Sequence, residues 1–385
     1  MTQADAQARA SRRAGPSQDE VVLLLGFPSF RAARILDVLL RDVEDGPRVR
    51  VHAVVHEKLA SSAETLLATY TEAQRRSVKV LVGDAGAIDM GLSGAEFRAL
   101  TAEVDVIHHA AQVSYPGVDR KTAEYVNVGA MREMLELAEA TPRLKACVVH
   151  SSASVSGNRT GLVRESELDE GQRFRNVIDE TLARAERMAR EAMRRVPIIV
   201  LRPAFVVGDS RTGDAERLDG PYLLVLLMLA APPEFVPPIP TRADARVHVV
   251  PVDWVAEAAV RLSRDPRAVG RTVHLCEENP PEVRAVLDLV ARAGGRRAPR
   301  GFLPANLTKT LLRAPGLEKM LRSPRTFLDA LATPVQYERT AAMELLADLP
   351  CPAFASYVEV LVAHVRKRID ERRASRDEGA PDPLF

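Results

Sequence analysis

The chain has 385 residues, of which 46% are hydrophobic and 27% charged, and its 53 basic and 52 acidic side chains give a net charge of +1. This length and apolar content allow one large α/β domain or two modest ones around a sizeable core. The near balance of charge argues against a general binder of nucleic acid or of membrane surfaces, so we expect neither as a partner.

In chain order, residues 1–19 are small, polar and charged, which predicts a flexible tail. From there to about residue 207, short apolar runs alternate with amphipathic segments. The apolar runs predict strands at 21–25, 49–55, 78–82, 105–108, 146–150 and 197–201, and the periodic segments predict helices at 31–41, 60–75, 94–102, 127–140 and 179–195. This alternation predicts an α/β fold, a Rossmann-type doubly wound parallel sheet, over residues 20–210.

Residues 211–372 predict a smaller, mostly helical C-terminal substrate lobe. It contains the irregular, proline-rich stretch 231–240. Two predicted strands, 247–250 and 272–275, interleave the lobe with the core sheet, and residues 282–372 are mostly helical in pattern. The last helix carries an apolar stripe, which we expect to pack on the core, formed by Phe354, Val358, Leu361, Val365 and Ile369. Residues 373–385 predict a second flexible tail.

Three scattered cysteines, Cys147, Cys276 and Cys351, lack the spacing of metal ligands. We therefore expect free thiols in a reducing compartment and no metal site. No apolar run reaches the roughly 18 residues that would span a bilayer, and the N-terminus shows no apolar core of a signal peptide. The sequence thus predicts a cytoplasmic protein without a membrane span.

The turn after the first predicted strand carries the first functional signal. In "LLLGFPSFRAARIL" (23–36), an apolar strand runs into a glycine and then into an amphipathic helix. A dinucleotide-binding turn uses glycines for the tight turn, for close approach of the pyrophosphate and for helix–strand packing. Gly26 keeps the turn, whereas Ser29 adds a side chain where the backbone should come close, and Pro28 removes an N–H donor. Ala32 is a mild replacement for the third glycine.

Seven further segments resemble the motifs of one protein family and follow one another in the order that the family has. They are "VLVGDAG" (80–86), "VDVIHHAAQV" (104–113), "YVNVGAMREMLELA" (125–138), "VVHSSASVSG" (148–157), "VLRPAFVVGDSRTG" (200–213), "VVPVDWVAEAAV" (249–260) and "VHL" (273–275). Together they resemble the extended short-chain dehydrogenase/reductase family of the NAD-dependent epimerase/dehydratase superfamily. The branch with thioester reductases and fatty acyl-CoA reductases, also called male-sterility proteins, is the most similar. The resemblance covers about residues 20–280.

The resemblance implies an NAD(P) cofactor and a set of residues around it. These are Gly26, Ser29, Phe30, His56, Asp84, Ala110, Ala111, Asn127 and Pro203. Asp84 would face the adenine. His56 stands where NAD enzymes commonly place an acidic residue and NADP enzymes an arginine, so the choice of cofactor stays open. The altered turn predicts binding that is weakened or absent.

The catalytic positions depart furthest from the family pattern. Its hydride chemistry uses a serine, a tyrosine acid/base and a lysine four residues later that lowers the pKa of the tyrosine. Ser152 matches the serine. Aligning Asn176 and Ala185–Glu186 with their family counterparts places Ile178 at the tyrosine position and Leu182 at the lysine position. Neither side chain can transfer a proton, and the pair reads as packing on one helix face.

Other residues are candidates for the missing acid/base groups. His150 and His109 are placed beside the predicted cleft, and Tyr115 follows the fourth strand. A lone histidine on a strand is more often structural than catalytic, and a serine without a neighbouring base is not an activated nucleophile.

Two functions remain in competition at this point. In the first, the chain has kept the fold, lost the reaction and acts as a binding, regulatory or scaffold protein for a small-molecule or acyl-type ligand. In the second, it is an active NADP-dependent oxidoreductase, an acyl-thioester or carbonyl reductase or an epimerase/dehydratase, with non-standard acid/base residues. The resemblance also implies a homodimer. The three departures at the turn, the tyrosine and the lysine favour the first.

Overall fold

The computed structural model describes residues 19–43, 49–115, 117–230, 245–298 and 334–377. Nearly all of the predicted N-terminal tail, the proline-rich stretch 231–240, part of the helical prediction after 282, and the last eight residues lie outside this range. Within it, no helix combines the length and the apolar character needed to cross a membrane.

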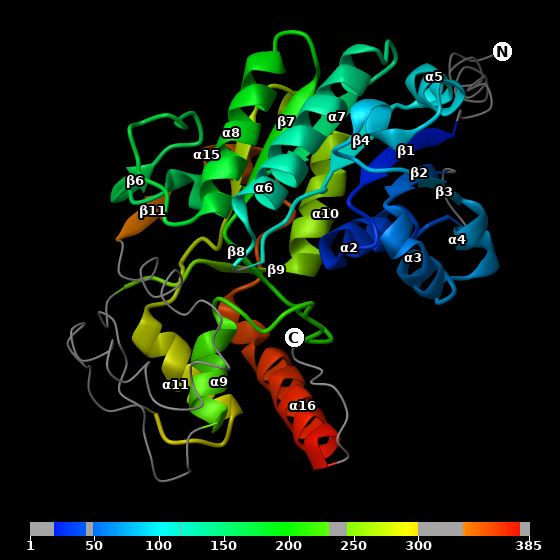
Figure 1. Cartoon of the computed structure of the whole chain (residues 1–385). Helices are drawn as coiled ribbons and strands as arrows, with labels where there is room; N and C mark the ends of the chain where they lie inside the picture. The colour runs from blue at the N-terminus through cyan, green and yellow to red at the C-terminus, as the bar shows by residue number, and fades with distance from the viewer. Residues whose placement is uncertain (1–18, 44–48, 116, 231–244, 299–333, 378–385) are drawn as a thin grey trace, which may run out of the picture.

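Seven parallel strands form the central sheet in the order β10-β7-β5-β4-β1-β2-β3 (Figure 1). The strands are β1 (Glu20–Leu25), β2 (Val49–Val55), β3 (Val78–Val82), β4 (Val106–His109), β5 (Ala146–His150), β7 (Ile198–Pro203) and β10 (Thr272–Leu275). The doubly wound fold and the strands expected for this sheet are thereby confirmed. The strand order reverses between β1 and β4, and such a switch point is where open α/β sheets bind ligands, outside the carboxyl ends of the strands.

Two helical layers cover the sheet, which explains why its strands are almost entirely apolar. Alternate residues of β1 face opposite layers: Val22 and Leu24 pack into one core, and Leu23 and Leu25 into the other. The first core includes residues of α2 (Phe30–Leu39) and α10 (Val252–Ser263), which lie against each other. The second includes residues of α5 (Gly94–Glu103), α7 (Ala130–Glu139) and α8 (Val177–Ala192).

Two predicted helices have a different extent. The segment 60–75 is broken into α3 (Ala60–Leu67) and α4 (Glu72–Arg76), because Thr71 and Gln74 form a capping box that starts a new helix. The predicted helix 127–140 begins as α7 only at Ala130. It is preceded by α6 (Arg120–Ala123) and a π-helical segment, η3 (Glu124–Gly129).

The C-terminal lobe has a core of its own. Helices α9 (Tyr222–Ala230), α11 (Val283–Ala293) and α16 (Val358–Asp377) group below the sheet in Figure 1 and share one apolar cluster. The apolar stripe of the last helix packs into this cluster. Phe354 lies outside the helix, on the turn η6 (Phe354–Ser356), and α16 runs to Asp377, so the prediction of a tail from residue 373 starts too early.

Short elements, most of them not predicted from the sequence, complete the fold. β6 (Gly161–Val163) pairs with β11 (Val335–Tyr337), and β8 (Phe205–Val207) pairs with β9 (Val249–Pro251). β9 overlaps the predicted strand 247–250, but it belongs to a separate two-stranded sheet instead of joining the central sheet as expected. Strands of three residues are too short to show an alternating pattern. The remaining short helices are η1 (Glu57–Leu59), η2 (Ile88–Gly91), η4 (Ala153–Ser156), η5 (Pro266–Ala268) and α15 (Thr340–Leu345). β11 adds a three-residue strand to a region whose described residues after 282 are otherwise mostly helical.

One carboxylate ties the segment after β11 to the sheet. Glu165 accepts a hydrogen bond from the His274 backbone N–H (3.0 Å) at one oxygen and from the Ala341 N–H (2.8 Å) at the other. In return, Glu338 accepts from the Glu165 N–H (2.9 Å). This segment is therefore anchored beside β10, at the edge of the central sheet.

Candidate functional site

A cavity of about 400 Å³ lies at the carboxyl edge of the sheet. Its wall comes from the start of α2, the loops after β4, β5 and β7, and the first two turns of α8. Pro203, which ends β7, is among the lining residues. The position, outside the strand ends, is the one expected of a ligand site in this fold.

Ser152 lies on the wall of this cavity, directly after β5. Its side chain caps the short helix η4 by accepting a hydrogen bond from the Ser154 N–H (3.2 Å). The hydroxyl proton is free of that interaction, so Ser152 can still donate a hydrogen bond to a ligand.

Ile178 and Leu182 lie one turn apart on α8, and both line the cavity. Leu182 is buried, and both residues pack with Val155 and Leu168 in a small apolar cluster. Where the resemblance implies an acid/base pair, the cavity therefore has a hydrocarbon wall that can exchange no proton.

The register of α8 is fixed at both ends. At the start, the Asn176 side chain accepts a hydrogen bond from the Asp179 N–H (2.9 Å) and caps the helix. Further along, the buried Glu186 carboxylate pairs with the Arg202 guanidinium (2.7 Å). Burial alone would raise the pKa of Glu186, but Arg202 and its other partners hold this pKa below its usual value. These anchors hold Ile178 and Leu182 toward the cavity.

The first βα turn is built for close packing against β4. Gly26 has a φ of +99°, and a Cβ at this position would lie 2.6 Å from the carbonyl carbon of Ala110 and 2.7 Å from the Ala111 nitrogen.

Ser29 caps α2 by accepting a hydrogen bond from the Ala32 N–H (3.4 Å). Phe30 lies under the Arg34 guanidinium, 4.9 Å from its ring centroid. The turn keeps its shape, but Pro28 offers no N–H and the Ser29 side chain serves the helix.

The residues expected at the adenine end lie together on the other side of the switch point. One Asp84 oxygen accepts a hydrogen bond from the Gly86 N–H (3.0 Å), and the other accepts from the Tyr125 hydroxyl (2.9 Å). The His56 imidazole lies 3.8 Å from Asp84 and accepts from the Lys58 N–H (3.1 Å). Both Asp84 oxygens already have protein partners, although each can accept a further hydrogen bond.

Asn127, which the resemblance places among the cofactor residues, makes its hydrogen bonds within the protein. Its side-chain oxygen accepts from the Val113 N–H (2.9 Å), and its nitrogen donates to the Thr181 hydroxyl (2.9 Å) and the Val113 carbonyl (3.3 Å). The buried amide thus ties the loop after β4 to α8 and positions two sides of the cavity relative to each other.

The candidate substitute acids and bases are poorly placed. His109 and His150 are buried; burial lowers the pKa of His109 to about 4 and that of His150 well below its usual range. Both imidazoles are therefore neutral at pH 7, and neither lines the 400 Å³ cavity. Tyr115 is exposed, with the Arg217 guanidinium 5.5 Å from its ring centroid, and it does not line the cavity either.

The structure brings two further polar groups to the cavity that sequence reasoning missed. Arg31, in the first turn of α2, lines the wall. With the Gln112 amide oriented to satisfy its neighbours, its oxygen accepts from Arg31 and its nitrogen donates to the His150 carbonyl (3.0 Å). A signal was available, because Arg31 stands four residues before the buried Ile35 and so falls on the apolar side of an amphipathic helix.

A smaller cavity of about 60 Å³ adjoins the first and shares Ser152, Ser154 and Arg175 with it. The hydroxyl groups of Ser156 and Tyr337 lie 3.4 Å apart on its wall. Burial raises the pKa of Tyr337 to about 12. Tyr337 comes from β11, far along the chain from the other site residues, so no local motif marked it.

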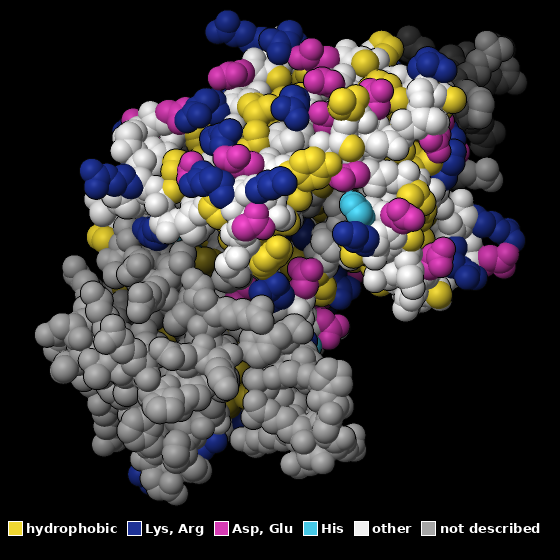
Figure 2. All heavy atoms as spheres, viewed as in Figure 1, with side chains coloured by type: hydrophobic (Ala, Val, Ile, Leu, Met, Phe, Trp, Pro, Cys, Tyr) yellow, Lys and Arg dark blue, Asp and Glu magenta, His cyan; other side chains and the backbone are white. Residues whose placement is uncertain are grey.

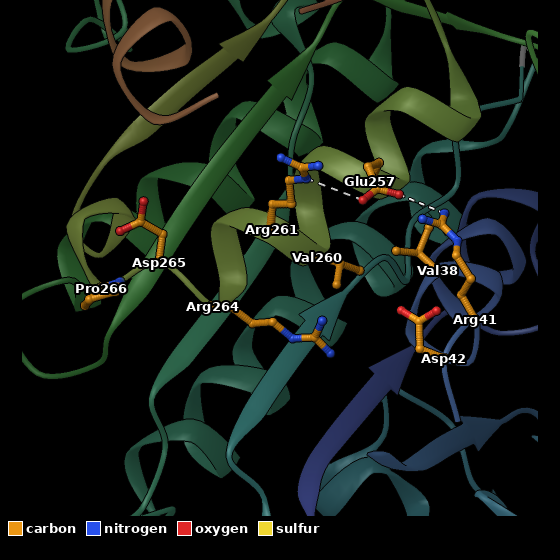
Figure 3. Close-up of a pocket in the computed structure, with 9 residues that line it drawn as sticks. All are labelled: Val38, Arg41, Asp42, Glu257, Val260, Arg261, Arg264, Asp265 and Pro266. Carbon is orange, nitrogen blue, oxygen red and sulfur yellow. Dashed lines mark hydrogen bonds and ion pairs between the residues drawn. The ribbon is translucent and has the colours of Figure 1, made fainter. Parts of the chain in front are cut away.

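A different hollow, of about 460 Å³, lies at the amino edge of the sheet, near the ends of α2 and α10 (Figure 3). Its arginines are engaged: Arg41 pairs with Glu257 (2.8 Å), Arg261 with the same carboxylate (3.4 Å), and Arg264 with Glu20 (2.7 Å). Although this hollow is larger, it lies away from the carboxyl ends of the strands and its arginines are already paired.

The surface that Figure 2 presents mixes Lys and Arg side chains with Asp and Glu side chains over the sheet-containing part of the molecule. Among the described residues, no group of three or more His, Cys, Asp or Glu side chains is arranged to hold a metal ion. The 400 Å³ cavity is therefore the best candidate for a functional site.

The chain matches the model of one protein family and resembles several known proteins. The family model, described as "Male sterility protein", matches residues 26–259. The chain is 28% identical over 292 residues to a component of the linear gramicidin synthase of Brevibacillus parabrevis, and 22% identical over 289 residues to fatty acyl-CoA reductase wat of Drosophila melanogaster. These matches take in 72% and 64% of this chain, but only 6% and 54% of the relatives.

Solved structures give the same picture of the fold. The terminal R domain of the myxalamid PKS-NRPS pathway superposes with a TM-score of 0.77 at 25% identity, over 93% of this chain and 92% of that one. UDP-glucuronic acid 4-epimerase from Bacillus cereus, in complex with NAD, superposes with a TM-score of 0.65 at 15% identity, over 91% and 98%. The second likeness is one of fold alone.

Proposed function

This chain belongs to the male sterility protein family, and from that premise we propose that it is a ligand-binding member that has lost the Tyr/Lys hydride-transfer chemistry. The fold is that of an NAD(P)-binding, reductase-like domain. The observation that carries the proposal is the apolar pair Ile178 and Leu182 on the cavity wall beside Ser152. A hydride transfer to a carbonyl needs a proton donor at the oxygen, and this pair supplies none.

The state of the turn and of the adenine end supports the same proposal. The residues present fit a dinucleotide only in part: Gly26 keeps the tight turn, but Pro28 lacks a donor and the Ser29 side chain caps the helix. Asp84 is held by Tyr125 and the Gly86 N–H. We propose that dinucleotide binding is weakened, and that the cavity serves binding, regulation or scaffolding with a small ligand.

A titration and a turnover assay test the proposal. The purified chain is titrated with NADPH and with NADH, following fluorescence and thermal shift, and then incubated with NADPH and an aldehyde or acyl thioester. We expect weak or no binding and no steady oxidation of NADPH. Tight binding together with steady oxidation by the unaltered chain would contradict the proposal.

A second candidate function rests on Tyr337. Its hydroxyl lies 3.4 Å from Ser156 in the small cavity that also reaches Ser152, so an active NADP-dependent oxidoreductase could draw its proton there. In that case the unaltered chain would consume NADPH, and Tyr337→Phe would abolish the consumption while leaving the protein folded. The raised pKa of Tyr337 argues against it as a base at neutral pH, because a proton shuttle works best with a pKa near the operating pH.

A further inference from the structure

The Arg31 side chain is a charged group at the cavity whose hydrogen-bonding capacity is only partly satisfied. Its Nε is buried without a hydrogen-bond partner among the described residues. The guanidinium makes no ion pair with the part of the chain that the structure describes, and its hydrogen-bond partner there is the neutral Gln112 amide. Burial lowers the pKa of Arg31 to about 10, with a small opposing effect of Glu216, so the group stays charged at pH 7.

The two acidic residues that line the cavity have other partners. Asp179 lines the same cavity, where its carboxylate accepts a hydrogen bond from the Asn176 side-chain amide (2.9 Å) and its backbone N–H donates to the Asn176 side-chain oxygen (2.9 Å). Asp219, also on the wall, pairs with Arg217 (3.1 Å). A desolvated cation without a counter-ion is unfavourable, and a buried charge in a native structure is normally paired. Within the described residues, no carboxylate lies within ion-pair distance of Arg31, and Glu216 acts on it only through a weaker, longer-range attraction.

Much of the rest of the wall is hydrocarbon, although Arg175, Asp179 and Asp219 also line it. Val118, Val177, Ile178, Leu182, Pro203 and Phe205 face the same 400 Å³ space as Arg31. Gln112 holds the guanidinium from one side, through an amide that is itself anchored on the His150 carbonyl. A positioned cation beside an apolar stretch of the wall favours a ligand with an anionic group and an apolar body.

We propose that the cavity binds an organic carboxylate, whose carboxylate group pairs with the Arg31 guanidinium and whose apolar body lies against the wall of Ile178 and Leu182. This inference rests on the proposed function, because it places a ligand where hydride chemistry would need the cofactor ring and the acid/base pair. It goes further by giving the charge and the class of that ligand. A neutral thioester or aldehyde offers Arg31 a carbonyl oxygen as a hydrogen-bond acceptor but no negative charge to pair with the guanidinium.

Calorimetric titration of the full chain with octanoate and with 1-octanol tests the proposal, because the two probes share a chain and differ in charge. We expect octanoate to bind at least tenfold more tightly. Arg31→Gln should bring the two affinities within about twofold of each other, and Arg31→Lys should keep part of the preference. Arg41→Gln, which removes a paired arginine just after α2, should leave the preference unchanged.

Thermal unfolding without ligand gives a second readout. If Arg31 is an unpaired charge in the ligand-free protein, Arg31→Met removes that unfavourable charge and should raise the melting temperature. Octanoate should then stabilise the unaltered protein but not this variant. If Arg31 were a structural residue, Arg31→Met would lower the melting temperature. Equal binding of octanoate and 1-octanol, or a carboxylate preference that survives Arg31→Gln, would overturn the proposal.

Measuring NADPH binding and turnover by the same proteins separates this proposal from the proposed function. Loss of NADPH binding in Arg31→Gln, with no preference for octanoate in the unaltered chain, would make Arg31 a phosphate ligand of a dinucleotide and would also overturn the inference. NADPH turnover by the unaltered chain would refute the loss of chemistry, whatever the octanoate result. The two failures are thus distinguishable.

Discussion

Gly26 and Ala110 approach so closely that a methyl group on Gly26 would lie 2.6 Å from the Ala110 carbonyl carbon. Gly26 also has a φ of +99°, which disfavours any side chain. We expect Gly26→Ala to lower the free energy of unfolding by about 2–5 kcal/mol, from the left-handed backbone and the contact together. Gly270→Ala is the matched control, since Gly270 has a φ of +78° but open space, and should cost about 1 kcal/mol. Urea unfolding measures both variants. Equal losses in the free energy of unfolding would mean that the close approach of Gly26 to Ala110 contributes little to the effect.

The same turn predicts how dinucleotide binding can be improved. Replacing Pro28 with alanine restores a backbone N–H, and replacing Ser29 with glycine removes the side chain at the helix start. We expect the double variant Pro28→Ala, Ser29→Gly to bind NADPH about tenfold more tightly, which corresponds to about 1.4 kcal/mol and one added hydrogen bond to a charged group. Fluorescence titration measures this. An unchanged affinity would place the obstacle elsewhere, for instance at Asp84.

The apolar pair on α8 can be converted into an acid/base pair. We expect the double variant Ile178→Tyr, Leu182→Lys to gain NADPH-dependent aldehyde reduction, by roughly two orders of magnitude over background. Neither single variant should gain it, because an unassisted tyrosine has a pKa near 10 and needs the cation. The assay follows NADPH absorbance. Adding Ser152→Ala should reduce the gain, and no gain in the double variant would show that further positions have changed.

The buried pair of Glu186 and Arg202 makes a prediction about stability. Glu186→Ala leaves the Arg202 guanidinium, 1% exposed, without its carboxylate, and we expect a loss of about 3–5 kcal/mol in the free energy of unfolding. Glu180→Ala, on the same helix, breaks an exposed pair with Arg120 and should cost less than about 1 kcal/mol. Chemical unfolding of both variants decides the point; similar losses would mean that the buried pair adds no more than the exposed one.

Buried histidines predict a loss of stability in mild acid. Burial, with a smaller effect of Arg264, lowers the pKa of His108 to about 3 in the folded state, whereas an unfolded histidine titrates near 6.5. Below about pH 6.5 His108 is protonated in the unfolded chain but stays neutral in the folded protein. The free energy of unfolding therefore falls by about 1.4 kcal/mol per pH unit. Burial raises the pKa of Glu277 to about 7, which opposes the trend.

Comparison of the unaltered chain with His108→Gln isolates the contribution of this histidine. Urea unfolding at about pH 7 and about pH 5 should show a smaller loss of stability for the variant, by about 1.4 kcal/mol per pH unit below 6.5. Parallel pH dependences would mean that His108 is protonated in the folded state or is hydrated there.

Most of the central sheet could be predicted from the sequence, because strands buried on both faces are short, continuous apolar runs. Val21–Leu25 and Ala146–His150 are examples. The break between α3 and α4 was missed because the capping box of Thr71 and Gln74 is a local polar signal inside a segment read for its apolar periodicity. The three-residue strands β6 and β11 carry no periodic signal at all.

The candidate site was predictable only in part. Ser152, Ile178 and Leu182 could be brought together because they fall on segments that resemble a family pattern. Tyr337 could not, because its role depends on which side chains surround it in space. Arg31 was missed although its place on the apolar side of α2 was a usable signal. Asn127 was expected near a cofactor, whereas its amide is engaged with Val113 and Thr181. Hydrogen-bond partners of this kind lie 14 and 54 residues away and leave no local signature.

The Glu165 carboxylate has a consequence for how this chain is made. Its two partners, the backbone N–H groups of His274 and Ala341, follow it by 109 and 176 residues. Domains fold while the ribosome is still adding residues, so β10 can dock on the sheet well before residue 341 emerges. During that interval one Glu165 oxygen lacks its partner, the Ala341 N–H, and the edge of the sheet beside β10 is not yet covered by the segment after β11. A nascent chain stalled before residue 335 should therefore be more readily cleaved by proteases around β6 than the finished protein.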